Sequence, residues 1–128
     1  MTCLPTDMTT RTRKVRGSRT QVLVAEAYRC IWPHATSAGA GAPGRDVLNV
    51  PLSIEVKGRR AFSPLAWIKQ ARGSARPEED EFPAHVVMRP DGVGEANIGD
   101  FLVIRRLADD IKLMAELAKL REGQSNGT

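Results

Sequence analysis

The chain of 128 residues contains few cysteines, few aromatic residues and no long apolar run. Cys3 lies in a polar N-terminal stretch and Cys30 in an expected helix, so we expect no disulfide framework. No stretch approaches the roughly 20 apolar residues of a membrane-spanning helix, and the N-terminal residues lack the apolar core of a signal peptide. These features predict a cytoplasmic protein with reduced cysteines and no membrane partner.

Several familiar functional motifs are missing as well. The sequence has no zinc-ligand spacing, no nucleophile elbow, no Walker-type phosphate loop and no internal repeat. Gly92-Val93-Gly94 is too short and too poorly placed to be a dinucleotide-binding fingerprint. The sequence therefore gives no support to structural zinc, serine-hydrolase, P-loop or Rossmann chemistry.

An excess of positive charge is present, and much of it lies near the N-terminus. The net charge is +4 and the pI is near 9.5, which suits an anionic partner. Five basic residues, with no acid among them, are typical of an arm that lies on nucleic acid, or alternatively of a solvated tail: Arg11, Arg13, Lys14, Arg16 and Arg19. We expect a flexible basic arm over residues 1–17, one domain over 18–121 and a disordered tail over 122–128.

Apolar periodicity and turn residues predict helices over residues 18–32, 63–73 and 107–120. Ser18 and Gln21 fit a capping box at the first helix, and Ser63-Pro64 starts the second. Strands are expected over 34–38, 83–89 and 100–106, the last with a buried run at 101–104. This order predicts an α/β fold with a small central mixed sheet flanked by helices. A core stripe is expected on the last helix at Leu107, Ile111, Met114, Leu117 and Leu120.

The segment Arg45–Lys57 reads RDVLNVPLSIEVK and is the most informative part of the chain. Turn residues near Val50-Pro51 predict a β-hairpin, in which Asp46 falls opposite Glu55. Side chains two apart on a strand share a face, so Lys57 joins both acids. Two adjacent carboxylates repel each other unless positive charge lies between them. Mg²⁺ and a lysine can supply that positive charge. Two acids and a lysine around a hydrated metal ion can catalyse the hydrolysis of a phosphodiester. Alternatively, the three residues form ordinary ion pairs on a solvated hairpin.

Asp46, followed nine residues later by Glu55-Val56-Lys57, resembles the signature of the PD-(D/E)xK nuclease superfamily. The small, glycine-rich stretch from Ser37 to Gly44 makes the segment most similar to the archaeal-type and phage-borne Holliday-junction resolvases. Arg45 replaces the proline of the signature. The resemblance implies a restriction-endonuclease-like core, Mg²⁺ (or Mn²⁺) as cofactor, a homodimer and four-way DNA junctions as substrate. Two surfaces are open as the dimer contact: the apolar side of the last helix and the strand Phe101–Ile104. For a phage-encoded chain, the compartment would be the host cytoplasm.

The resemblance also implies roles for individual residues. Asp46 and Glu55 would bind the metal together with the backbone carbonyl of Val56. Lys57 would position the attacking water, and Glu26 of the first helix would complete or tune the site as a third acid. The residues expected to contact DNA are Arg13, Lys14, Arg16, Arg19, Ser37, Arg59, Arg60, Lys69 and Gln70.

Two other functions remain open at this point. One is a different nuclease of the same superfamily, acting in repair on flaps, nicks or duplex DNA. The other is a non-catalytic nucleic-acid-binding protein in which the acids are only structural. A chain of this length has little room for base readout, which favours recognition of DNA shape.

Overall fold

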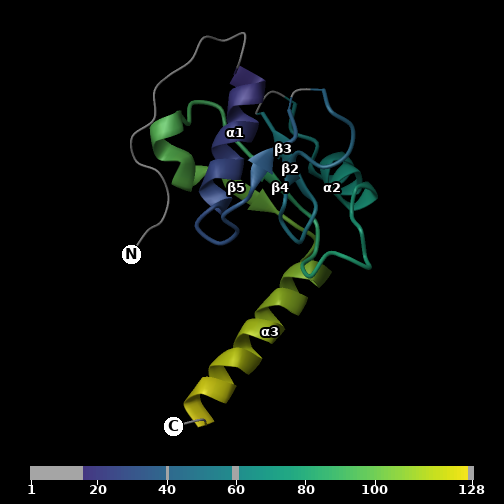
Figure 1. The fold of residues 1–128 in the computed structure, drawn as a ribbon, viewed down its shortest axis with the longest axis vertical. Coiled ribbons are helices and arrows are strands. Elements are labelled where there is room, and N and C mark those ends of the chain that lie inside the picture. The colour runs from purple at the N-terminus through teal and green to yellow at the C-terminus, as the bar shows by residue number, and fades with distance from the viewer. Residues whose placement is uncertain (1–15, 40, 59–60, 127–128) are drawn as a thin grey trace.

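The computed structural model describes residues 16–39, 41–58 and 61–126. This part of the chain forms helices and short strands (Figure 1). In chain order the elements are α1 (Arg16–Tyr28), β1 (Thr36–Ser37), β2 (Val47–Leu48), β3 (Ile54–Lys57), α2 (Pro64–Gly73), β4 (His85–Met88), the 3₁₀ segment η2 (Glu95–Asp100), β5 (Leu102–Ile104) and α3 (Leu107–Asn126).

Strands β3, β4 and β5 form a mixed three-stranded sheet in that order. β3 and β4 are parallel, and β4 and β5 are antiparallel. Parallel neighbours need a crossover connection, which α2 supplies between β3 and β4. β1 and β2 form a separate antiparallel pair. The predicted α/β class with a small mixed sheet and flanking helices is therefore confirmed.

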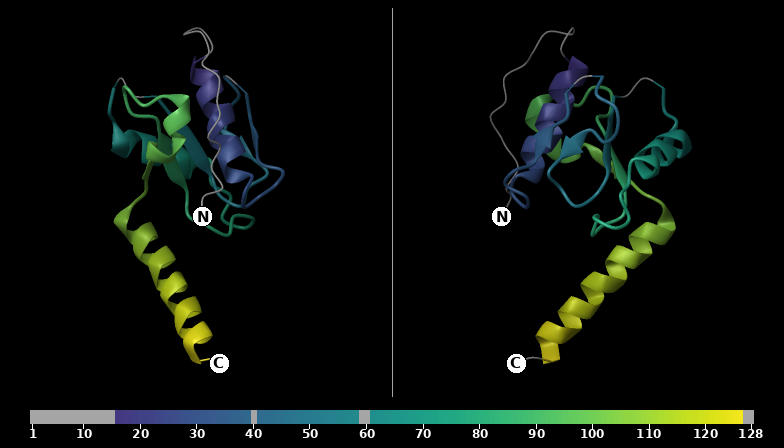
Figure 2. Two further views of the ribbon diagram at one scale, coloured as in Figure 1. Left: turned by 90° about the vertical axis from the view of Figure 1, so that its left-hand side faces the viewer. Right: turned by 45° about the vertical axis from the view of Figure 1, so that its right-hand side comes forward.

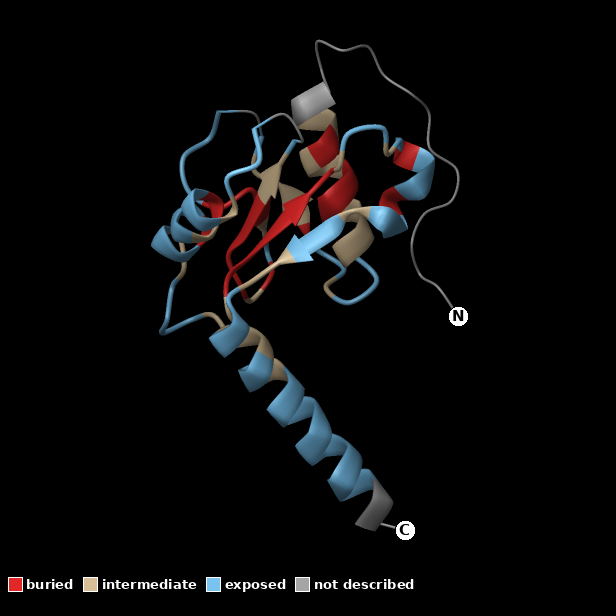
Figure 3. Ribbon diagram, turned by 180° about the vertical axis from the view of Figure 1, so that it is seen from behind, coloured by how far each residue is buried: buried red, intermediate tan, exposed pale blue. Residues whose placement is uncertain are grey.

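The sheet lies between α1 on one side and α2 on the other (Figure 2). Successive side chains of a strand point to opposite faces, so Val86 and Val87 of β4 enter different clusters. Val87 packs with Ile54 and with Val24 of α1, whereas Val86 packs with Trp67 of α2. The buried residues concentrate at the centre of the sheet and on the inner side of α1 (Figure 3).

The expected hairpin around Val50-Pro51 is wrong. β2 pairs with β1, and β3 pairs with β4, so the two arms of the predicted hairpin belong to different sheets. Asn49 adopts φ 64° and turns the chain between β2 and β3. The two arms nevertheless share a backbone hydrogen bond, because the backbone N–H of Asp46 donates to the Ile54 carbonyl at 3.0 Å. This contact brings Asp46 beside β3.

Helix boundaries differ from the predicted ones. α1 begins at Arg16, so Ser18 lies inside the helix and is not its cap. It ends at Tyr28, whose carbonyl accepts from the amides of Ile31 and Trp32 in the following turns. α2 begins at Pro64 and ends at Gly73 as expected, although Ser63 makes no side-chain capping bond.

The predicted roles of the C-terminal elements are also wrong. α3 continues to Asn126, so residues 122–126 are helical, while 127–128 lie outside the described residues. All five residues of its apolar stripe are exposed, because the helix extends away from the rest of the protein (Figure 1). Leu102 and Val103 are about half exposed, because β5 is an edge strand.

Two predictions about the environment have different outcomes. Cys30 is disulfide-bonded and the described residues include no free cysteine, so the expectation of reduced cysteines is wrong for Cys30. Cys3 lies outside the described residues. Within the described ranges, none of the helices is both long enough and apolar enough to cross a membrane.

Candidate active site

Asp46, Glu55 and Lys57 come together at β3, as the sequence predicts. β3 carries Glu55 and Lys57, and Asp46 immediately precedes β2. Asp46 is held against β3 by its own backbone bond to Ile54 and by its side chain. Its Oδ2 accepts the backbone N–H of Val56 at 2.7 Å. These two bonds fix the Asp46 carboxylate beside Glu55 on β3.

A residue of α1 reaches Asp46, and that residue is Gln21. The Nε2 of Gln21 donates to Asp46 Oδ1 at 3.2 Å. Its Oε1 accepts from the Ser37 hydroxyl at 3.2 Å, and Ser37 Oγ accepts from the Gly39 amide at 3.1 Å. Ser37 therefore takes part in the site through Gln21. The bonds fix the orientation of the Gln21 amide and, through it, the rotamer of Asp46.

Lys57 is held between Glu55 and α2. Its Nζ lies 3.3 Å from Glu55 Oε2 and donates to Gln70 Oε1 at 2.7 Å. Gln70, one of the residues expected to contact DNA, therefore lies beside Lys57. Lys69, its neighbour on α2, is exposed.

The electrostatics of Glu55 distinguish it from a surface acid. Its side chain is buried, and its Oε1 has no hydrogen-bond partner within the described part of the chain. Burial raises the pKa of Glu55 above its usual value, and the negative charge of Asp46 raises it further, while Lys57 opposes the shift. A buried carboxylate oxygen without a partner is costly. A cation between the two carboxylates would reverse both unfavourable effects.

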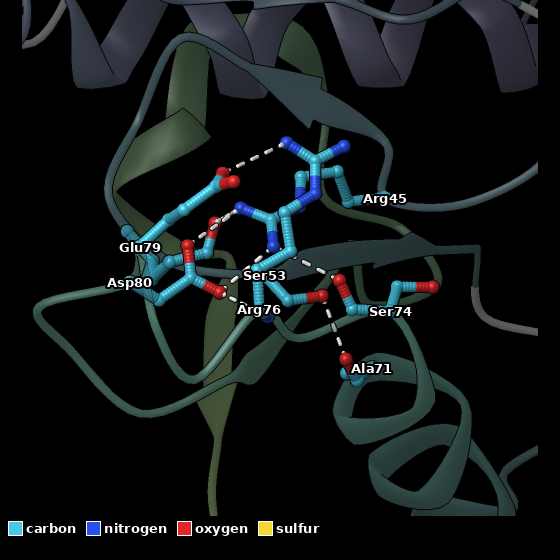
Figure 4. Close-up of polar contacts among 8 residues, drawn as sticks. Arg45, Ser53, Ala71, Ser74, Arg76, Glu79 and Asp80 are labelled. Atoms are coloured by element: carbon cyan, nitrogen blue, oxygen red, sulfur yellow. Dashed lines mark hydrogen bonds and ion pairs between the residues drawn. The ribbon is translucent and has the colours of Figure 1, made fainter.

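Arg45 precedes Asp46 and is buried. Its guanidinium bonds both oxygens of Asp80 at 2.9 and 2.8 Å (Figure 4). It also donates to the carbonyls of Leu52 and Ser74, each at 2.9 Å. Arg45 therefore ties the start of the Asp46 segment to the turn before β3, to the end of α2 and to the loop before β4.

The charge of Asp80 is stabilised by this arrangement. Burial alone would raise the pKa of Asp80, but the hydrogen bonds from Arg45 and from the backbone N–H of Arg76 outweigh it. The net effect lowers the pKa, so Asp80 stays ionised at neutral pH.

The structure does not bring Glu26 into a group with Asp46 and Glu55. Across residues 16–39, 41–58 and 61–126, no cluster of three or more His, Cys, Asp or Glu side chains could hold a metal ion. Glu26 follows Gln21 by five positions, which places it about 140° away around the helix. The residue that α1 presents to Asp46 is consequently an amide and not the predicted third acid.

The predicted DNA-contacting residues are only partly placed. Arg19 forms an ion pair with buried Glu95 at 3.4 Å. Arg16 is the first residue of α1. Four other basic residues lie outside the described residues: Arg13, Lys14, Arg59 and Arg60.

Comparisons with protein-family models, with curated proteins and with solved structures give no match, so the function is inferred from the site itself.

Proposed function

We propose that this chain is a Mg²⁺-dependent endonuclease that hydrolyses DNA phosphodiester bonds, of the Holliday-junction resolvase type. The observation that carries the proposal is the buried Glu55 carboxylate. One of its oxygens lacks a hydrogen-bond partner in the described residues, Asp46 lies beside it, and Lys57 contacts its other oxygen. An ordinary ion pair would satisfy both oxygens or leave them in water.

The residues present fit a hard divalent cation. Mg²⁺ favours a few carboxylate oxygens and waters, and Asp46 and Glu55 supply such oxygens, with the Val56 carbonyl as a further ligand. Each Asp46 oxygen accepts one hydrogen bond, from Gln21 or from Val56, and keeps a lone pair for a cation. Mn²⁺ prefers the same oxygen ligands.

The chain's own residues position the reacting groups. When bound, Mg²⁺ supplies Lewis acidity and a water of lowered pKa. Lys57 carries three donors, of which Glu55 and Gln70 use two. The third can orient a water or stabilise negative charge on a phosphate oxygen. Gln70 limits the motion of the Lys57 ammonium, and Gln21 limits that of Asp46.

The finer features of the proposal follow from the resemblance. They are a restriction-endonuclease-like core, a branched four-way junction as substrate, a cytoplasmic location and a homodimer. A junction is close to two-fold symmetric, so two copies of the site related by a two-fold axis suit paired cuts. The basic residues Arg13, Lys14, Arg16, Arg59 and Arg60 are proposed to bind the DNA backbone, with Arg19 and Lys69 beside them.

A cleavage assay tests the proposal. It compares a four-way junction with a linear duplex of the same sequence, in Mg²⁺ and in EDTA. The proteins are wild type, Asp46→Ala and the control Glu78→Ala, which removes an exposed acid and changes the net charge equally. We expect symmetric nicks in the junction alone, lost in EDTA and in Asp46→Ala and kept in Glu78→Ala. Junction binding by Asp46→Ala should persist or tighten, because one fewer negative charge faces the phosphates.

Other outcomes would change the assignment in defined ways. Metal-dependent cutting of both substrates would keep the site but indicate a repair, flap or nicking nuclease. Tight DNA binding without cutting, unaffected by Mg²⁺, would refute the nuclease proposal and indicate a non-catalytic nucleic-acid-binding protein.

A further inference from the structure

α3 is a 20-residue helix with an apolar stripe that no other part of the described chain covers. Figures 1 and 2 show it extending from the end of β5 away from the sheet and from the other two helices. The large apolar side chains of the stripe are between 46% and 73% exposed: Leu107, Ile111, Met114, Leu117 and Leu120. Isolated helices are marginal in water, and most of their stability in proteins comes from packing an amphipathic face.

A second apolar surface lies beside the start of α3. β5 is an edge strand whose Leu102 and Val103 are 48% and 46% exposed. On the α1 side of the sheet, an apolar groove of about 250 Å³ runs between α1 and β5. Val103, Phe101 and Ile98 line one side of the groove, and Tyr28 and Ile31 line the other. Ile31 at its rim is exposed.

We propose that a second copy of this chain covers both surfaces. In the dimer, the apolar stripe of α3 from each protomer packs on the β5 edge and the adjoining groove of its partner. A two-fold axis makes this contact twice, because the stripe of each chain packs on the sheet edge of the other. Both protomers then use the same surfaces, which is an isologous arrangement. The unpaired edge of β5 is then covered, as edges of stable sheets usually are.

The available area is sufficient for a stable dimer. Seven large apolar side chains lie on the two surfaces, five on α3 and two on β5, and each is about half exposed or more. Together they remove several hundred Å² per partner, on the order of the ~800 Å² that a standard interface buries on each side. Exposed apolar patches of this size are unusual on monomers.

One chain carries both complementary surfaces, which favours a second copy over an unrelated partner. The donor stripe and the acceptor groove are separated only by Arg105 and Arg106, which connect β5 to α3. Arg105 and Arg106 pair with Asp110 and Asp109 in the first turn of α3, at 3.5 and 3.1 Å. These partly exposed ion pairs link the connecting residues to the first turn of the helix.

This inference stands on the exposed surfaces and does not depend on metal or nuclease activity. It deepens the homodimer of the proposed function by naming its interface. A dimer without cleavage would refute the nuclease and keep the interface. Cleavage by a monomer would support the nuclease and refute the interface.

The test measures mass in solution by light scattering after gel filtration over a hundredfold range of concentration. The proteins are wild type, Ile111→Asp with Met114→Asp, and a control with Lys112→Gln and Lys119→Gln. The control changes the net charge of the same helix by the same two units, at exposed positions on the side opposite the stripe. We expect wild type and the control to be dimers. The stripe variant should stay monomeric at concentrations at least tenfold above those at which wild type dimerises.

Circular dichroism keeps the result interpretable. The stripe variant should retain the signal of the folded domain and lose only the helical signal of α3. A wild-type monomer at all concentrations would overturn the proposal, and so would a dimer that survives in the stripe variant. Equal dissociation of the stripe variant and the control would also overturn it, because helix charge and not the stripe would then decide assembly.

Discussion

The buried ion pair between Arg45 and Asp80 gives the sharpest prediction about stability. Asp80→Asn keeps the size of the side chain and one acceptor oxygen but removes the charge. Arg45 is almost fully enclosed, so its charge is then left without a counter-charge. Removing one partner of a buried pair costs about 3–5 kcal/mol of the free energy of unfolding. Domains have only about 5–15 kcal/mol in total.

A neighbouring ion pair supplies the matched control. Arg76 and Glu79 lie in the same loop at 3.7 Å, but their side chains are 60% and 71% exposed (Figure 4). Glu79→Gln makes the same change in net charge as Asp80→Asn. Exposed pairs contribute about 0–1 kcal/mol, so this variant should unfold close to wild type.

Urea unfolding followed by the fluorescence of Trp32 and Trp67 measures both effects. Since m in urea is about 1–3 kcal/mol per M for small proteins, a loss of about 4 kcal/mol moves the midpoint by roughly 2 M. Glu79→Gln should move it by less than about 0.5 M. If Asp80→Asn shifts the midpoint no more than Glu79→Gln does, the enclosed pair is not what holds the Asp46 segment in place.

Three further predictions concern pH and the site. Burial first, and then the charge of Arg105, lower the pKa of His85 from 6.5 to about 4, while Tyr28 bonds its Nε2 at 2.7 Å. Because the folded pKa is the lower one, this stability is full above about pH 6.5 and is lost by up to about 3 kcal/mol as the pH falls towards 4. His85→Gln should flatten that slope in urea titrations, whereas His34→Gln, an exposed histidine, should not. Gln21→Ala should reduce Mg²⁺ affinity or cleavage by about 10–100-fold, as loss of a residue that orients a ligand typically does, and Glu26→Ala should not; the reverse order would restore Glu26 to the site. Mg²⁺ at about 100 times its Kd should stabilise the wild type by about 2.7 kcal/mol in thermal melts, and an equal gain in Asp46→Asn would exclude Asp46 as a ligand.

The Asp46, Glu55 and Lys57 cluster is predictable because its geometry is local. Alternation along a strand places Lys57 on the side of Glu55, and any tight return of the chain brings Asp46 close. The pairing itself is not predictable in this way. Glu55 lies opposite Val86 in the parallel ladder, 31 residues later in the chain. Nothing in the segment Arg45–Lys57 indicates that such a distant strand is a better partner than β2. Asp46 therefore lies beside Glu55 as expected, although the two strands do not form the expected hairpin.

Gln21 and Arg45 were missed for the same physical reason. Gln21 meets Asp46 across 25 residues, and Arg45 meets Asp80 across 35. The sequence does contain one signal for Gln21: it is a polar residue beside the apolar run of α1, next to buried Leu23 and Val24. Helical spacing puts it and Glu26 on different faces, so at most one of the two can face Asp46. Helical geometry therefore shows that Gln21 and Glu26 cannot both face Asp46. Only the tertiary contact shows that Gln21 is the one that does.

The stripe on α3 shows a different limit of sequence reasoning. The spacing of Leu107, Ile111 and Met114 correctly predicts a helix with one apolar face, since periodicity depends only on the helix itself. What covers that face depends on the direction in which the helix leaves β5, and the spacing of the stripe does not encode that direction. An apolar stripe that packs inside its own chain and one that packs on a partner have the same sequence pattern. The exposure of the stripe in the folded chain is therefore the observation that turns a predicted core helix into a proposed interface.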